Sequence, residues 1–163
     1  MAVSTVVKNL RDGTLTIEDG AALSLAVPFD LGDIALSGLM EGQKEVAKYL
    51  SRGDLASVRY TNQTFPTISW SCLMTDVSDA ASYVTDACLR RGAWAAATST
   101  YSSATGAVYT VKLTWAIEGT ELGDGADHSI VLDDVRITSV DATEGDPNSY
   151  KFSGEVLGSI TLT

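Results

Sequence analysis

The sequence is poor in several residue types, and each shortage excludes a class of site. Its 163 residues include two cysteines, one histidine and three prolines. A structural zinc site takes about four Cys or His ligands at close spacing, and the isolated Cys72, Cys88 and His128 do not supply such a pattern. No Gly-x-Ser-x-Gly motif accompanies His128. We therefore expect no metal, no cofactor and no catalytic residue, and His128 is interpreted as a turn residue at the start of a strand.

Basic residues are also scarce, with 11 Lys and Arg against 21 Asp and Glu, for a net charge of −10. Proteins hold phosphate through Lys and Arg that displace counterions, so the charge argues against a tight grip on nucleic acid or anionic lipid. No stretch approaches the roughly 20 apolar residues of a membrane span. The first residues lack a basic segment followed by an apolar one, so we expect no export signal and two reduced, buried cysteines.

Alternating apolar and polar residues predict a mainly β protein. In residues 67–74, for example, Ile68, Trp70, Cys72 and Met74 fall on one face and small hydroxyl side chains on the other, which is typical of a half-buried antiparallel strand. We expect one domain, residues 1–163, with an antiparallel β-sandwich or barrel and one or two helices packed on it. The predicted strands cover residues 3–10, 14–18, 22–27, 34–37, 55–60, 67–74, 107–117, 130–140 and 149–162. Residues 93–103 fit either an outer strand or an extended arm.

Two segments have helical patterns. In residues 41–52, Val46 and Leu50 lie four apart, charged pairs occupy the opposite face, and Gly53 supplies a stop. In residues 78–90, small apolar residues form one stripe, and Asp76 or Ser78 could cap the first turn.

Acidic residues concentrate near the end of the chain. From Glu118 to Asp146 there are nine acids and one base, Arg136, between two alternating segments. Within this run, Asp133 and Asp134 coincide with a change of apolar parity, from Ile130 and Leu132 to Val135 and Ile137, which predicts a β-bulge. Neighbouring carboxylates on a strand point to opposite faces, so this pair is not expected to act together on one bond unless a bulge realigns the two side chains.

Two regions of the chain resemble a known family. The stretch LSRGDLASVR at residues 50–59, followed by PTISWS at 66–71, resembles the middle of siphophage major tail proteins, the subunits of the phage tail tube. The stretches DVRIT at 134–138 and EGDPNSYKFSG at 144–154 resemble the C-terminal hairpin of the same family.

The resemblance implies a structural, non-enzymatic virion protein made in the host cytoplasm. Six copies would form a ring, and rings would stack into a tube through which DNA leaves without specific binding. Other implied partners are the tape measure, terminator and distal tail proteins. An acidic channel wall would repel passing DNA, and the candidate lumen acids are among Glu118, Glu121, Asp124, Asp127, Asp133, Asp134, Asp141 and Glu144.

Contacts between rings are expected from an N-terminal arm and two loops, at residues 28–33 and 61–66. The candidate contact residues are Met1, Ala2, Val3, Pro28, Phe29, Asp30, Asn62 and Gln63. The alternative hypothesis is an acidic β-sandwich that binds carbohydrate or calcium through Trp70, Trp94, Trp115 or the Asp-rich turns, although no spacing matches an EF-hand. Trp70 and Trp115 fall on apolar faces, which favours a place in the core.

Overall fold

The computed structural model describes residues 13–75, 83–100, 108–119 and 125–163. The predicted strand at 3–10 therefore lies outside the described residues. The structure is mainly antiparallel β, as the sequence predicts, with one short helix, α1 (Val84–Leu89). No helix in the described ranges is long and apolar enough to cross a membrane. The strands are β1 (Gly13–Glu18), β2 (Ser24–Ala26), β3 (Ala35–Ser37), β4 (Lys44–Ser51), β5 (Asp54–Gln63), β6 (Thr67–Leu73), β7 (Val111–Ile117), β8 (His128–Thr143), β9 (Ser149–Val156) and β10 (Ile160–Leu162).

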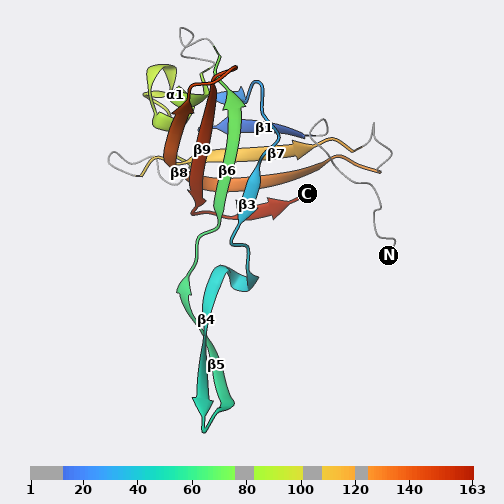
Figure 1. The fold of residues 1–163 in the computed structure, drawn as a ribbon, viewed down its shortest axis with the longest axis vertical. Coiled ribbons are helices and arrows are strands. Elements are labelled where there is room, and N and C mark those ends of the chain that lie inside the picture. Colours follow the sequence, from blue (N-terminus) through green and yellow to red (C-terminus); the bar gives the residue numbers. More distant parts are fainter. Residues whose placement is uncertain (1–12, 76–82, 101–107, 120–124) are drawn as a thin grey trace.

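Two parts are distinct in Figure 1, where a hairpin formed by β4 and β5 projects away from all the other strands. Those other strands, which we call the β-body, form one sheet in the order β2-β1-β7-β8-β9-β6-β3, and β10 pairs with β8. Figure 1 shows β1 and β7 running across the view and β6 and β9 nearly upright. The long sheet therefore bends over itself and encloses the core between its two halves.

Strand β8 makes the bend, and a bulge lies where the sequence predicts one. Val111 pairs with Val135 and Leu113 with Leu132, so β8 carries one extra residue between these pairs. Asp134 occupies the left-handed region with a φ of 54°. Because of this extra residue, both Leu132 and Val135 point into the core. Bulges increase local twist and turn strands from one layer to another.

The core combines residues from both halves of the sheet. Leu15, Ile17 and Leu113 come from β1 and β7, whereas the rings of Trp70 and Phe152 stack across β6 and β9 with centroids 5.2 Å apart. Burying each such side chain contributes about 1.5–3 kcal/mol. The side chains of Ile68, Trp70 and Cys72 all point into the core, which confirms the strand predicted there and the core position of Trp70.

Four sequence predictions about elements are wrong in whole or part. Residues 41–52 form a 3-10 turn followed by β4 rather than a helix. Of the predicted helix 78–90, α1 covers only Val84–Leu89, and its predicted start lies outside the described residues. Residues 92–94 form a 3-10 turn that buries Trp94, not an outer strand. The last strand is interrupted after Val156, and β10 pairs with β8 instead of continuing β9.

Candidate assembly interface

The β4–β5 hairpin is closed by a two-residue turn. Ser51 pairs with Asp54, and between them Arg52 and Gly53 have φ values of 51° and 95°. Two consecutive positive φ angles define a type I′ turn, whose twist matches that of the flanking strands. Val46, Val58 and Tyr60 favour extended backbone. These local preferences explain why the helix predicted at 41–52 does not form and why Gly53 ends a strand instead.

One face of the hairpin is apolar and open to solvent. The register places Val46 opposite Tyr60, Lys48 opposite Val58 and Leu50 opposite Leu55, all on the same face. The opposite face is more polar and pairs Ala47 with Arg59 and Tyr49 with Ser57. All residues of β5 are exposed, and Leu50 and Leu55 keep 66% and 58% of their surface. We call Val46, Leu50, Leu55, Val58 and Tyr60 the hairpin face.

Such a hairpin gains little stability by itself. An isolated two-stranded hairpin is marginally stable in water, and packing against a further layer is what normally stabilises it. Here none of residues 44–63 belongs to the buried core cluster. The Thr64 amide donates to the Gln43 carbonyl (2.9 Å) and joins the two strands at their base. A contiguous exposed apolar surface of this kind marks an interaction site.

The hairpin also differs from the rest of the chain in charge. Residues 44–63 contain four bases, Lys44, Lys48, Arg52 and Arg59, and two acids, so their net charge is +2. The remaining residues hold seven bases and nineteen acids, a net charge of −12. The hairpin is thus a basic, apolar projection from an acidic body.

The end of the β-body remote from the hairpin carries exposed acids and an exposed aromatic ring. Strand β6 leaves the hairpin at Thr67 and runs about 20 Å to Leu73, whose amide donates to the Phe29 carbonyl (3.1 Å). The next amide, that of Met74, donates to the Asn148 carbonyl (2.9 Å) in the β8–β9 turn. Phe29 is 67% exposed. Together with the exposed acids Asp141, Glu144 and Asp146 of the turn, it forms what we call the far-end surface.

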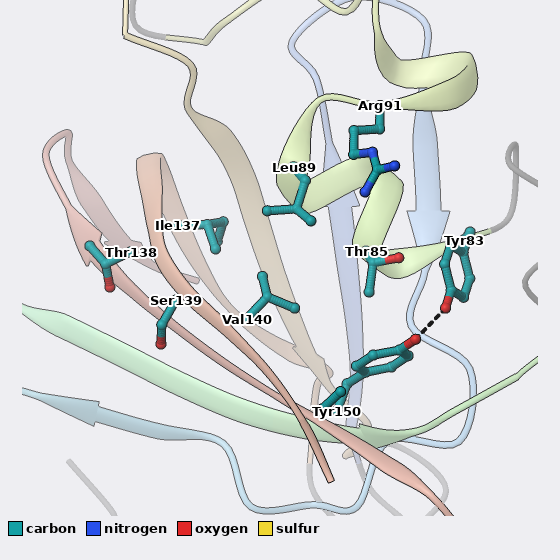
Figure 2. A pocket seen from close by; sticks show the side chains of 10 residues that line it. Tyr83, Thr85, Leu89, Arg91, Ile137, Thr138, Ser139, Val140 and Tyr150 are labelled. Atoms are coloured by element: carbon teal, nitrogen blue, oxygen red, sulfur yellow. Dashed lines mark hydrogen bonds between the residues drawn. The ribbon is translucent and has the colours of Figure 1, made fainter. Parts of the chain in front are cut away.

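A groove of about 400 Å³ lies beside this turn, between α1 and β8 (Figure 2). Leu89 and Arg91 project into it from the α1 side, and Ile137 and Val140 from β8. At one end, the hydroxyl groups of Tyr83 and Tyr150 form a short hydrogen bond. Burial and this contact with Tyr83 raise the pKa of Tyr150 to about 12, so the phenol is neutral at physiological pH. The groove offers apolar contacts with one cation at its rim and no group set up for catalysis.

The predicted lumen acids do not form one cluster. Glu121 and Asp124 lie outside the described residues, and Glu118 is half-buried. Three others accept hydrogen bonds from neighbouring backbone or hydroxyl groups. Asp127 accepts from the Gly119 amide (3.0 Å), Asp133 from the Ser159 hydroxyl (2.7 Å) and Asp134 from the Thr110 hydroxyl (3.4 Å). Asp141 and Glu144 are exposed at the β8–β9 end. The lumen assignment itself stays a prediction.

The described residues among the predicted inter-ring contacts lie at the base of the hairpin and at the far end of the β-body. Met1, Ala2 and Val3 are outside the described residues. Asn62 and Gln63 belong to β5, so residues 61–63 are strand and not the predicted turn. Pro28, Phe29 and Asp30 lie at the far end, where Asp30 bridges to Cys72. Burial raises the pKa of the Asp30 carboxyl, and a hydrogen bond from the Gly32 amide (2.7 Å) opposes that effect.

The hairpin face itself was not among the predicted contacts. Its signal in the sequence is the Arg52-Gly53 pair between segments rich in Val and Tyr. The spacing of Val46 and Leu50 does not distinguish this hairpin from a helix, because residues four apart share a face in a strand as well as in a helix.

The remaining candidates from the sequence are parts of the core. Cys72 and Cys88 are free and buried, as expected. Burial raises the pKa of the Cys72 thiol to about 11 and that of Cys88 further still. Trp70 and Trp94 are buried, and Trp115 is partly buried against the core, so none is an open sugar platform. In the described ranges, no three His, Cys, Asp or Glu side chains are grouped to hold a metal ion.

The fold, a bent antiparallel β-body with a projecting hairpin, is similar to that of chains in solved injection-system assemblies. A chain in the cryo-EM structure of the sheath/tube terminator of an extracellular contractile injection system, PVC, superposes with a TM-score of 0.61. The two chains are 11% identical, and the match covers 99% of each. A chain in the PVC sheath-tube complex in its extended state gives a TM-score of 0.59 at 8% identity, again over 99% of each chain.

A third structure, the baseplate of the anti-feeding prophage, gives a TM-score of 0.54 at 9% identity, over 100% of this chain and 97% of the other. No protein-family model matches the chain, and no curated protein is significantly similar to it in sequence. The expected tail-tube fold is therefore confirmed at a coarser level than the sequence suggested. These structures are injection-system assemblies, and they do not single out siphophages.

Proposed function

We propose that this chain is a structural subunit of a tail-like tube, in which six copies form a ring and rings stack around a channel. The single observation that carries the proposal is the hairpin face, an apolar surface held away from the β-body and left without a partner in the described structure. Such a surface is a liability in a monomer, and it becomes useful when other copies cover it.

The fold supports the same function. The similar chains come from a sheath/tube terminator, a sheath-tube complex and a baseplate. In our proposal the chain takes the place of the major tube subunit and contacts terminator and sheath or baseplate proteins at its ends. The chain would then act in a tail-like injection apparatus, with no catalytic step of its own.

The charge supports a channel that does not adhere to polyanions. A subunit with a net charge of −10 offers few sites for phosphate. In the proposed tube, DNA is the passing cargo, and acids such as Glu118, Asp127, Asp133 and Asp134 contribute to a negative wall. Passage would then depend on repulsion from the wall and not on specific binding.

Negative-stain electron microscopy of the purified protein over a range of concentrations tests the proposal. We expect six-fold rings and short tubes. Rings that never stack would favour a terminator role over a tube role. A protein that stays monomeric at high concentration in every salt, and that binds calcium or a defined glycan, would exclude both and favour the binding-module alternative.

A further inference from the structure

The opposite ends of the molecule are complementary, and this inference rests on the proposed function. We propose that the hairpin face of one copy docks on the far-end surface of a second copy, so that copies join head to tail. The occupant of the hairpin face is therefore another copy of this chain, and the contact is the one that stacks one ring on the next.

Apolar groups are available on both sides of such a contact. The hairpin contributes Val46, Leu50, Leu55, Val58 and Tyr60, all about half exposed or more. The far end contributes Phe29, which is 67% exposed, and the adjoining groove of about 400 Å³. Exposed Leu89 lines that groove together with Val140 and Tyr150. A groove of this volume accommodates one or two side chains of the size of Leu50 or Leu55.

Charge gives the contact its direction. The hairpin has four bases and two acids, whereas residues 141–151 have three acids and one base, Lys151, which pairs across the strands with Asp141. The adjoining groove adds a second base, Arg91, so the far end with its groove keeps an excess of acid. Two hairpins repel each other, and so do two far-end surfaces. A hairpin against a far-end surface is attractive, and complementary potentials of this kind fix the partner and the orientation.

The two surfaces are also placed for stacking. In Figure 1 the hairpin and α1 lie at opposite ends of the longest dimension of the molecule. The register agrees, because β6 leaves the hairpin at Thr67 and reaches Ser149 of β9 at Leu73. A contact between two different surfaces of identical subunits repeats without limit unless it closes a ring. A head-to-tail contact along the long axis therefore extends a stack.

This proposal places two of the acids predicted for the lumen on a different surface. Asp141 and Glu144 belong to the far-end surface in our proposal and face the hairpin of the next copy. Both are exposed, and the hydrogen bond that Asp141 accepts from the Ser139 hydroxyl is long (3.4 Å). Their carboxylates are thus available for Lys44 and Lys48 of a neighbour, which lie on the same face of β4 as Val46 and Leu50.

Paired charge reversals test the contact. The hairpin variant is Lys44→Glu with Lys48→Glu, both on the face of β4 that carries Val46 and Leu50, and it takes the net charge from −10 to −14. The far-end variant is Asp141→Lys with Glu144→Lys, which takes it to −6. The combined variant carries all four changes and returns to −10. Sedimentation velocity and negative-stain microscopy at low salt give the concentration at which stacked rings appear, and circular dichroism checks the fold.

We expect each double variant to raise that concentration by at least roughly tenfold, because several charge pairs turn repulsive in every ring contact. The combined variant, and a mixture of the two double variants, should stack within about threefold of the unchanged protein, since attraction is restored. A general effect of net charge predicts the opposite for the far-end variant, which should then stack more readily than the unchanged protein.

Two results would overturn the inference. One is a far-end variant that stacks as well as the unchanged protein, and the other is a combined variant that fails to recover although it is folded. If the unchanged protein itself forms neither rings nor stacks, the proposed function fails and the head-to-tail contact fails with it. If rings and stacks form equally well with and without the far-end substitutions, only the proposed head-to-tail contact is refuted.

Discussion

At the residue scale, two glycines near the bend of the sheet are fixed by close packing. A Cβ on Gly158 would lie 2.6 Å from Asp134 Oδ2 and 2.7 Å from the Asp133 carbonyl oxygen, next to the bulge of β8. A Cβ on Gly154 would lie 2.9 Å from the Arg136 carbonyl oxygen. Since real Cβ atoms do not approach backbone so closely, a side chain at either position displaces β8 from its neighbours.

We expect Gly158→Ala and Gly154→Ala each to lower the free energy of unfolding by about 1–3 kcal/mol, the usual cost of overpacking. Urea unfolding followed by circular dichroism measures the change. Gly125→Ala is the matched control, because nothing lies within 4 Å of a Cβ there, and its effect should stay within about 0.5 kcal/mol. Equal effects at all three positions would show that β8 does not pack this tightly at the bend.

A second prediction at this scale concerns the Cys72 thiol. Burial, followed by the nearby charges of Asp30 and Asp33, raises its pKa to about 11. The thiol therefore ionises at lower pH in the unfolded chain than in the folded one. Its contribution to stability is fully present below the unfolded pKa and is lost as the pH rises through the folded pKa near 11.

Stability measured from pH 8 upward should consequently fall less steeply in Cys72→Ala than in the unchanged protein. The substitution lowers stability by a similar amount at every pH through lost packing, so the slope and not the offset carries the test. Parallel curves would mean that Cys72 is equally easy to ionise in both states.

At the scale of elements, the sequence predicts strands of the β-body better than the hairpin. The sequence predicts β1 and β6 correctly, because apolar and polar residues alternate in a strand that has one buried and one exposed face. Leu15, Ile17 and Trp70 lie on the buried faces. The sequence also predicts the bulge at Asp134, because the extra residue shifts the buried positions of β8 from even-numbered to odd-numbered residues. In β4 that signal is missing, since no face is buried within the chain. The spacing of Val46 and Leu50 fits a helix as well as a strand.

The hairpin face gives a prediction of its own. We expect Leu50→Ser with Leu55→Ser to leave the free energy of unfolding within about 0.5 kcal/mol, because both side chains are exposed in the monomer. The same variant should lose the stacking of rings into tubes. Calorimetry measures the first effect and negative-stain microscopy the second.

Tyr49→Ser supplies the control for this prediction. Tyr49 is 52% exposed and lies on the opposite face of the same hairpin, across from Ser57. Assembly should survive this change. If both variants assemble normally, the hairpin face is not a contact. If only the Leu variant unfolds at a lower temperature, the face packs within the monomer instead.

At the scale of the whole molecule, the sequence predicts the class of fold but not where the ends of the molecule lie. The sequence predicts contacts at both Phe29 and Gln63, but it does not show that these residues lie near opposite ends of β6. That relation depends on pairings between strands far apart in sequence, such as β6 with β9. The sequence does not distinguish the environments of Asp133 and Asp141. In the structure Asp133 accepts a hydrogen bond from Ser159 beside the bulge, whereas Asp141 is exposed at the far end.

The net charge of −10 and the basic hairpin have opposite consequences for assembly. Copies placed side by side repel one another, and salt screens that repulsion, so higher ionic strength should favour rings. Head-to-tail contacts are attractive between hairpin and far end, and salt screens that attraction too, so stacking should weaken. We therefore expect rings to increase and tube length to decrease as salt rises from about 20 to 500 mM, where the Debye length falls below ~5 Å.

Counting rings and tubes in micrographs across this salt series separates the two effects. The Lys44→Glu and Lys48→Glu variant should keep the first response, because its body remains acidic, and should lose the second, because its hairpin no longer attracts the far end. Tube length that rises with salt would mean that repulsion also limits stacking. Ring formation that is independent of salt would mean that apolar burial and strand pairing between copies outweigh the charge of the subunit.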